Sequence, residues 1–421
     1  MRDITYWIWL SLSVTPGGKS FNKLISKFGS AEAVYSADEN DIIECIGSRS
    51  RDCKSLAEKD LGEAERIKKF CEKHGVGVLL YCDDEYPESL RGIDSPPVLL
   101  YYRGKLPDFK SACTVSMVGT RNLSDYGRKN AFHIGYDLAL SGITLVSGMA
   151  LGIDGVSHAG ALAAGGVNVA ILGCGIDICY PSQHLRLARE IIKSGCIMTE
   201  YAPGRKADRY TFPKRNRIIA ALSAATIVVE GRERSGSLIT ARYAREFGRC
   251  VYALPGNVDN KTSRASNLLI KNGAKLITSA DDVIADMLEA CPGVVNPHAL
   301  TEKPAVNMFD VFAELEVSCV TPGDSIFKVT PAKAQKKQES ESSGAPQAPP
   351  SEARPKPSLN VSGLDGDVIR IYNKIPEGGA ITTDELVSAE DKMPFVMKAL
   401  LMLEMRGFVT MLPGERVTRS N

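Results

Sequence analysis

Between Ala112 and Cys291 the sequence repeats one pattern: a short apolar run, a turn that contains glycine, and a stretch with helical periodicity. Apolar runs this short and continuous are typical of strands covered on both faces. The runs are Thr114–Val118, Ile143–Ser147, Val167–Leu172, Cys196–Thr199, Thr226–Val229 and Cys250–Leu254. Their alternation with helices predicts an α/β domain over residues 112–291, built on a doubly wound, mostly parallel, Rossmann-like sheet.

The segments before and after this domain have other patterns, and a chain of 421 residues suggests two or three domains. Residues 1–65 mix apolar and polar side chains at helical spacing, which predicts a small helical domain of the SAM or helix-hairpin type. Residues 66–111 form a connecting segment with one strand candidate, Val76–Tyr81. Residues 292–321 are an extension whose structure the pattern does not specify.

The C-terminal part divides into a linker and a small domain. Residues 322–360 consist largely of Pro, Ser, Lys, Glu and Ala, which cannot bury a core, so we expect a disordered linker. Residues 361–421 regain helical periodicity, with helix starts near Asp367 and Thr382 and a third helix over Phe395–Met405. A hairpin pattern follows over Gly407–Val417. Three helices and a hairpin of this size predict a winged helix.

Net charge does not identify a partner, because 51 basic residues face 50 acidic ones. The distribution is more informative: from Arg205 to Arg249 there are eleven Arg or Lys and four Asp or Glu. Such a local excess attracts phosphate groups. The alternative is a basic, solvated face without a ligand, and charge alone favours that alternative.

Cysteine usage and hydropathy indicate a cytoplasmic protein. The eleven cysteines are scattered, form no Cys-x-x-Cys pair and lack metal-ligand spacing, as expected for reduced thiols in a cytosol. The apolar run that follows Met1 lacks a cleavage site and is too short to span a bilayer. We therefore expect no membrane partner, no metal and no cofactor.

Unusual residues follow the predicted strands at their carboxyl ends, where ligands bind in open parallel sheets. After the first strand, Gly119 lets the backbone approach a ligand, and Arg121 projects over a helix start that favours an anion. After the second strand, Ser147 and Gly148 begin a run to Asp154 that predicts another tight cradle.

Aromatic and basic residues interleave in the fourth connection, and a second basic and polar run opens the helix after the fifth strand. Interleaving of this kind suits a single nucleic-acid strand, since bases stack on rings and guanidinium planes while positive charge follows the phosphates. The candidates from these two connections are Arg209, Phe212, Arg215, Asn216, Arg217, Arg234, Ser235, Gly236 and Ser237.

Structural roles compete with some of these assignments. Arg215 and Arg217 can instead form ion pairs that hold loops in place. The carboxylates available for this are Glu200 and Glu230, each at the end of a predicted strand. The sequence leaves both roles open for the two arginines.

Several other residues suggest stacking, catalytic or nucleotide-binding roles that the sequence does not support. Tyr210 and Phe212 belong to a residue class found more often in cores than on stacking surfaces, and His158 is better suited to holding a loop than to acting as a base. Gly18-Lys19-Ser20 lacks the earlier glycine of a P-loop, so we expect a turn between helices. Gly173-Cys174-Gly175 lacks the third glycine of a dinucleotide fingerprint.

Several strings together resemble the DNA processing protein A family, also called DprA or Smf. They occur in family order over about residues 112–278, and their combination is highly specific. The strings are Val118–Arg121, Ser147–Asp154, Phe212–Ile219, Ser235–Ala241, Pro255–Asn257 and Asn267–Ala274. Tyr86-Pro87, Pro96-Pro97, the N-terminal helical region and the winged helix fit the family as well.

The resemblance implies a DNA-binding protein that is not an enzyme. Members of the family bind and protect single-stranded DNA without sequence specificity, form homodimers or larger oligomers, and load the RecA recombinase during DNA uptake, without a cofactor. By motif position, Arg121 contacts a DNA phosphate, while Arg209 and Phe212 lie in the DNA groove. Arg234 and Lys271 match further basic positions.

Two other classes of protein remain as alternatives. One is a nucleotide-binding or nucleotide-hydrolysing enzyme of the related phosphoribohydrolases, but the strand end at Glu230-Gly231-Arg232 lacks their Pro-Gly-Gly-x-Gly-Thr-x-x-Glu motif. The other is a protein-binding adaptor that acts through the winged helix. The chain also departs from the DprA pattern at Ala265, where the family usually has Gly, which weakens the match at Lys271.

Overall fold

In the computed structural model the chain forms two compact units, residues 1–336 and 337–421, and each is described by itself. The structure describes residues 3–297, 301, 304–316, 328–329, 366–376, 380–386, 396, 399–400, 403, 408–412 and 416–419.

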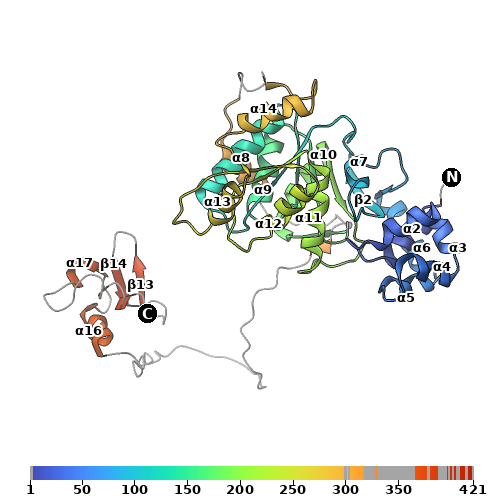
Figure 1. Cartoon of the computed structure of the whole chain (residues 1–421). Coiled ribbons are helices and arrows are strands. Elements are labelled where there is room, and N and C mark those ends of the chain that lie inside the picture. Colours follow the sequence, from blue (N-terminus) through green and yellow to red (C-terminus); the bar gives the residue numbers. More distant parts are fainter. Residues whose placement is uncertain are drawn as a thin grey trace, which may run out of the picture. The chain divides into compact units, whose positions relative to one another are not determined.

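A nine-stranded sheet forms the centre of the first unit (Figure 1). Its strands are β1 Gly77–Leu80, β2 Leu99–Gly104, β3 Thr114–Val118, β4 Thr144–Ser147, β5 Asn168–Ile171, β7 Cys196–Thr199, β8 Ala225–Val228, β9 Cys250–Ala253 and β10 Lys275–Leu276. The strand order is β1-β2-β7-β5-β4-β3-β8-β9-β10. Neighbouring strands from β7 to β10 run parallel, whereas β1 with β2 and β2 with β7 are antiparallel. The predicted doubly wound, mostly parallel α/β fold is therefore confirmed.

Residues 66–111 do more than connect two domains. The strand predicted at Val76–Tyr81 is present as β1, but β2 was not expected, and together they continue the sheet beyond β7. A short helix, α7 (Glu88–Arg91), lies between them. The sheet therefore begins well before the predicted domain boundary at residue 112.

Helices cover both faces of the sheet (Figure 1). They are α8 Asp125–Leu140, α9 Ile153–Ala163, α10 Leu185–Ser194, α11 Thr211–Leu222, α12 Ser237–Glu246, α13 Arg264–Lys271 and α14 Asp281–Ala290. Because side chains alternate along a strand, Val115 and Met117 of β3 pack on the α8–α9 side, while Val118 packs on the α11–α12 side. Each parallel strand is thus buried on both faces, which explains its continuous apolar sequence.

The N-terminal region is helical, as predicted, and shares its core with the sheet. Its helices are α1 Ile4–Ser13, α2 Ser20–Phe28, α3 Ala31–Ser36, α4 Glu39–Ile46, α5 Asp52–Ala57 and α6 Gly62–His74. Trp7 and Leu10 of α1 belong to the same buried apolar cluster as Tyr101 of β2 and Ile197 of β7. Gly18 and Lys19 lie in the turn between α1 and α2, as expected, and Ser20 begins α2.

After α14 the chain returns to the α/β unit. Helix α15 (Met308–Glu316) packs on α9 through Phe312, which makes an edge contact with Phe132 of α8 at 5.6 Å between ring centroids. Lys328–Val329 form β11, which pairs in parallel with β6 (Ile178–Cys179). Lys328 and Val329 therefore form a strand within the segment 322–360, which was expected to be a disordered linker. The other residues of this segment lie outside those that the structure describes.

Among its described residues, the second unit contains helix α16 (Gly366–Lys374), the short helix α17 (Thr383–Leu386) and three strands. Strands β12 (Ala380–Thr382), β13 (Val409–Leu412) and β14 (Arg416–Arg419) are antiparallel, and β13–β14 match the predicted hairpin. Most of the expected third helix lies outside the described residues, so the winged helix stays a prediction. Within the described part of the chain, no helix has the length and apolar character needed to cross a membrane.

Candidate functional site: a basic cleft at the carboxyl edge of the sheet

The strand order reverses between β3 and β8. The chain runs from β3 through β4 and β5 to β7 on one side, and then returns to the other side of β3 as β8. At such a switch point the connections after the two central strands diverge, which leaves a crevice at their carboxyl ends. A cleft of about 350 Å³ lies there, and we call it the switch-point cleft. It is lined by Val118, Gly119, Thr120, Arg121, Ala150, Asp154, Phe212, Pro213, Arg215, Asn216, Arg232, Arg234, Ser235, Gly236, Ser237, Ile239 and Thr240.

Arg121 and Phe212 form a flat surface at this cleft. The guanidinium carbon of Arg121 lies 5.0 Å from the centroid of the Phe212 ring. Phe212 is half-buried and packs on Tyr180 at 5.4 Å between centroids, which fixes the ring in place. Arg121 is exposed, so its charge can meet a ligand. A cation beside an anchored ring can hold a phosphate and a base together.

Arg215 supplies buried positive charge at the base of the cleft. Its guanidinium donates to the carbonyl oxygens of Gly148, at 2.7 Å, and of Ile171, and its Nε donates to Asn216 Oδ1 at 3.1 Å. Burial lowers the pKa of Arg215, while the negative charge of Asp154 raises it. A Cβ at position 148 would overlap the Arg215 guanidinium, so glycine is required there to leave room for that side chain.

The loop between β4 and α9 is fitted against the loop that carries Arg121. Gly152 has a φ of +82°, and a Cβ there would overlap the carbonyl oxygens of Thr120 and Arg121. The Ile153 amide donates to Thr120 O at 3.1 Å. The two loops can therefore position each other, and the backbone that presents Arg121 is held by its neighbour.

Asp154 is the acidic residue among those that line the cleft. Its carboxyl group is buried, which raises its pKa, whereas the charges of Arg215 and Arg121 lower it. Four arginines line the same cleft, so their positive charge outweighs this single carboxylate. The cleft therefore favours an anionic ligand.

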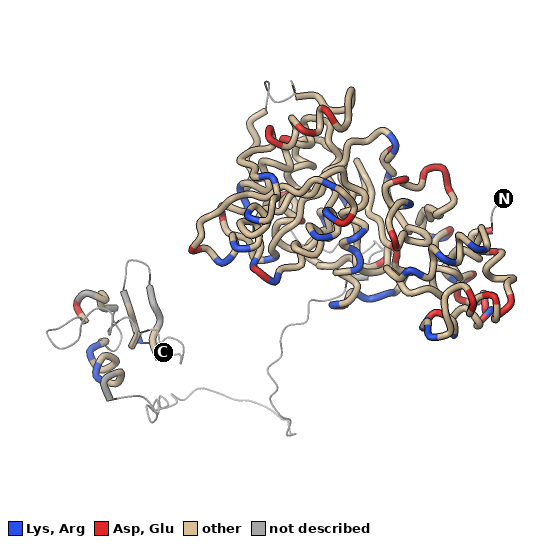
Figure 2. Tube along the Cα trace, in the orientation of Figure 1, with Lys and Arg blue, Asp and Glu red and all other residues tan. Residues whose placement is uncertain are grey.

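The N-terminus of α12 faces the same cleft. Gly236 precedes this helix without a side-chain cap, so the positive end of the helix dipole faces the cleft, although the Leu238 and Ile239 amides donate to Ser235 O at 3.2 Å and to Gly236 O at 3.1 Å. Arg232 and Arg234 are exposed beside it. Figure 2 shows that Lys and Arg also occur along α11. The helix N-terminus and the guanidinium groups together form a site suited to phosphate oxygens.

Glu230 holds the loop before α8 and is not paired with an arginine. Its carboxylate accepts from the Ser124 amide at 3.0 Å, from Ser124 Oγ at 2.5 Å and from Thr262 Oγ1 at 3.1 Å. Ser124 caps α8 in turn by accepting from the Gly127 amide. Glu230 thus ties the ends of β3 and β8 together below the cleft.

Three predicted site residues do not line the cleft. Gly148 is buried against the Arg215 guanidinium. Arg217 is only 2% exposed and forms an ion pair with Glu200 at 2.5 Å, which is the structural role that the sequence left open. Ser147 is buried, and its Oγ donates to Met117 O at 2.6 Å, which joins β4 to β3. We therefore remove Arg217 and Ser147 from the candidate DNA site, since both side chains are buried in structural contacts and neither lines the cleft.

Two further candidates are exposed but lie beyond the residues that line the cleft. Arg209 stacks on Tyr210, and Lys271 ends α13. Their contact with DNA stays a prediction. Conversely, sequence reasoning did not select Thr120, Arg232 or Thr240, all of which line the cleft. Arg232 lies two positions before Arg234 in the same basic run, and that was the available signal.

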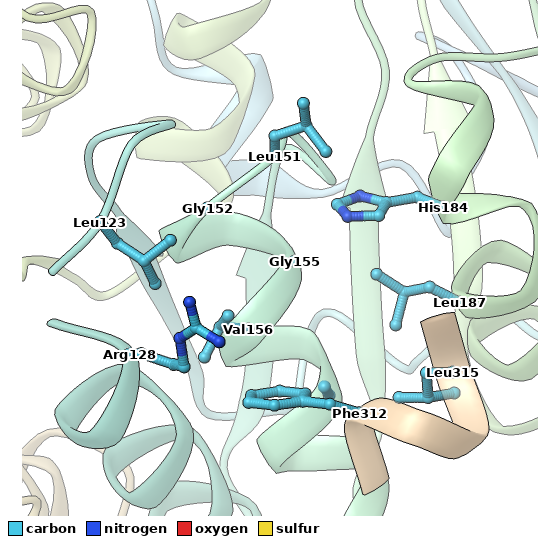
Figure 3. A pocket seen from close by; sticks show the side chains of 11 residues that line it. Leu123, Arg128, Leu151, Gly152, Gly155, Val156, His184, Leu187, Phe312 and Leu315 are labelled. Carbon is cyan, nitrogen blue, oxygen red and sulfur yellow. The ribbon is translucent and has the colours of Figure 1, made fainter. Parts of the chain in front are cut away.

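A second pocket, of about 140 Å³, lies on the far side of the β4–α9 loop (Figure 3). Phe312 and Leu315 of α15 form one wall of it, and Leu151 forms another (Figure 3). His184 lines it as well, and its Nδ1 hydrogen-bonds with the carbonyl oxygen of Met149 at 2.9 Å. Met149 has a φ of +53°, an uncommon value for a residue with a side chain, so this bond supports a strained turn. The pocket is lined mainly by apolar side chains, and the residues around it support the β4–α9 loop.

His158 has a structural role, as the sequence favoured. Its ring is completely buried in α9, and Nδ1 hydrogen-bonds with Asn168 Oδ1 at 2.8 Å. Burial lowers the pKa of His158 to about 4, although the bond to Asn168 opposes the shift. A neutral imidazole in this position joins α9 to β5 and does not face the cleft.

Fold and site together define a Rossmann-like α/β protein with a basic cleft at its switch point. The family model described as DNA recombination-mediator protein A matches residues 77–288. The chain belongs to this family, which confirms the resemblance seen in the sequence motifs. The match begins at β1, in agreement with a sheet that starts before residue 112.

Named relatives agree with this assignment. Protein Smf of Synechocystis sp. is 37% identical over 290 residues, which cover 67% of this chain and 72% of that protein. DNA processing protein DprA of Streptococcus pneumoniae is 40% identical over 226 residues, which cover 54% of this chain and 78% of that one. The X-ray structure of the Streptococcus pneumoniae protein superposes with a TM-score of 0.59 at 34% identity, covering 68% of this chain and 99% of that chain.

Proposed function

We propose that this protein binds single-stranded DNA in the switch-point cleft, without regard to base order. One observation carries the proposal: Arg121 lies 5.0 Å over the anchored ring of Phe212, beside the uncapped N-terminus of α12. The guanidinium and the positive end of the helix dipole suit a phosphate, and the ring suits a base. All three lie at the switch point of the sheet, where Rossmann-like folds bind their ligands.

The stacking surface favours a single strand over a duplex. In a duplex the faces of the bases are covered by their neighbours, whereas a single strand can turn a base onto Phe212. Phosphate contacts and base stacking are both insensitive to sequence, because every base has a flat face and every nucleotide has the same backbone. The expected result is tight binding of any single strand.

Membership of a recombination-mediator family supports a further part of the proposal. By covering single-stranded DNA, the protein protects it and helps load the RecA recombinase onto it during DNA uptake and recombination. It acts by binding, and no catalytic step is assigned to it. The rival activity, nucleotide hydrolysis, predicts release of a free base from nucleoside monophosphates by the purified protein.

We also propose that the protein works as a homodimer or larger oligomer, assembled through the α/β unit. Exposed apolar side chains support this, since Leu276 belongs to the edge strand β10 and Leu268 belongs to α13, which packs on the neighbouring strand β9. Light scattering of residues 1–336 is expected to give a dimer at micromolar concentration. A monomer under those conditions contradicts assembly through this unit.

The central test is a gel shift with matched single-stranded and double-stranded oligonucleotides of several sequences. We expect the single strands to bind with similar affinities and the duplexes to bind more weakly. Preference for one sequence, or for the duplexes, contradicts the proposal. Arg121→Glu replaces attraction by repulsion and is expected to bind more weakly than Arg121→Ala.

A further inference from the structure

A second groove, of about 220 Å³, lies on the other side of the first turn of α11. Leu12 and Pro16, from the end of α1 and the loop after it, form one wall. The opposite wall is the chain that leads into α11, including Arg205, Tyr210 and Lys214. We call this the Tyr210 groove. The groove lies at the surface where the N-terminal helical region meets the α/β fold.

The periodicity of α11 places this groove next to the switch-point cleft. Phe212 and Arg215 are three residues apart, share one side of the helix and line the cleft. Tyr210 and Lys214 are four residues apart, share the next side and line the groove. A strand that passes over Phe212 therefore meets Tyr210 after crossing a single helical turn.

Tyr210 has the exposure of a stacking platform. It is 63% exposed, which is far more than a ring that fills a core. The guanidinium carbon of Arg209 lies 4.8 Å from its centroid, and Arg209 Nη2 donates to the Tyr210 hydroxyl at 2.6 Å. An arginine that braces an exposed ring gives the same combination as Arg121 with Phe212 in the cleft.

Charge around the groove favours an anion. Lys214 makes no ion pair within the part of the chain that the structure describes. The nearby carboxylates are already engaged: Asp208 pairs with Arg205 at 2.7 Å, and Glu200 pairs with the buried Arg217. The free positive charge of Lys214 is therefore available to a phosphate.

We propose that the Tyr210 groove binds the next nucleotides of the same single strand that occupies the switch-point cleft. A base stacks on Tyr210, a phosphate lies near Lys214, and Leu12 makes apolar contact with the strand. The N-terminal helical region thereby contributes to DNA binding. This proposal rests on the proposed function, because continuity with the cleft is part of its argument.

The test compares a short oligothymidylate of about 4 nucleotides with a long one of about 16 nucleotides, using fluorescence anisotropy of the full-length chain. We expect Tyr210→Ala to bind the short strand like the wild type and to lose about fivefold to a hundredfold in affinity for the long strand. Tyr210→Phe keeps the ring and is expected to retain affinity for both. Lys214→Glu is expected to weaken binding of the long strand only.

A charge control comes from Lys193, which is exposed at the end of α10, at the opposite edge of the sheet from the cleft. Lys193→Glu makes the same change of charge as Lys214→Glu and should leave both affinities unchanged. Melting curves for each variant exclude misfolding as the cause of any loss.

Two other outcomes for Tyr210→Ala contradict the proposal that the Tyr210 groove binds DNA. If folded Tyr210→Ala binds the long strand like the wild type, the groove does not hold DNA, and a peptide becomes the better candidate for its occupant. If Tyr210→Ala loses affinity for both strands equally, Tyr210 belongs to the first site. A wild-type protein that binds neither strand contradicts the proposed function itself, which separates that failure from failure of the proposal for the Tyr210 groove.

Discussion

The guanidinium of Arg121 and the ring of Phe212 lie 5.0 Å apart, although one follows β3 and the other opens α11. The pair brings a charged group and an uncharged aromatic surface to one point of the switch-point cleft. Charge and stacking respond differently to salt, because mobile ions screen only the first. Their contributions to DNA binding can therefore be separated.

Salt dependence distinguishes the roles of these two residues. For single strands, the slope of log K against log salt is about −0.7 per phosphate neutralised. We expect Arg121→Ala to make the slope shallower by about that amount, and Phe212→Ala to weaken binding by about 1–3 kcal/mol with little change in slope. Affinities measured at four salt concentrations give both quantities.

Melting temperatures serve as the control for these variants, since both side chains are at least partly accessible and neither should be needed for folding. If Arg121→Ala keeps the wild-type slope, the guanidinium does not contact a phosphate. If both variants lose their fold, the two residues are structural and the cleft loses its main support as the DNA site.

In contrast to the variants of Arg121 and Phe212, Arg217→Ala is expected to lower the stability of the fold and to leave DNA affinity nearly unchanged. Its removal leaves the Glu200 carboxylate buried without a partner, which costs about 3–5 kcal/mol of stability. Burial already raises the pKa of Glu200, so part of this cost can be relieved by protonation. We expect urea unfolding at a lower concentration and nearly unchanged DNA affinity for the protein that remains folded. A stable variant that binds DNA weakly would return Arg217 to the DNA site.

Acid should destabilise the protein through His158. The pKa of this histidine is about 4 in the folded protein, compared with 6.5 for the free side chain, so between these values only the unfolded chain takes up the proton. Stability therefore falls as the pH decreases from about 6.5 to 4, by up to about 3 kcal/mol from this residue. His158→Gln can still donate to Asn168 but does not titrate. Its melting temperature should vary less with pH than that of the wild type, and equal dependence in both proteins argues against the assignment.

Removal of residues 337–421 should spare most of the affinity for single-stranded DNA. All residues of the switch-point cleft and of the Tyr210 groove belong to the first unit, which ends at Lys336. Titration of a labelled single strand with the full chain and with residues 1–336 tests this expectation. Loss of binding on truncation would mean that the main DNA site lies in the second unit.

Local pattern was sufficient for the parallel strands and insufficient for β2. The bounds of β3 and β7 were predicted to the residue, because each is a short apolar run next to a glycine turn. Leu99–Gly104 follows the Pro96-Pro97 pair and pairs with β1 and β7, so its identity as a strand depends on distant partners. Val98–Tyr102 is itself an apolar run after a proline turn, but the run alone does not show that it joins the main sheet.

The same limit applies to the arginines of the site. Arg215 and Arg217 lie two positions apart on α11, which directs them to different sides of the helix. Arg215 faces the switch-point cleft. Arg217 faces the N-terminal region and forms its ion pair with Glu200, which follows β7. The sequence gives the spacing, but only the packing of α11 on the sheet decides which arginine is available to a ligand.

The core shared by α1 and the sheet restricts how this fold can change in evolution. With Trp7 and Leu10 in one apolar cluster with Tyr101 and Ile197, the helical region covers sheet surface that would otherwise meet water. A lineage that lost these helices in one step would expose that surface and risk aggregation. Loss of the region therefore requires earlier or simultaneous replacement of positions such as Tyr101 by polar residues. The N-terminal helices are thus less exchangeable than a domain joined to its neighbour only by a linker.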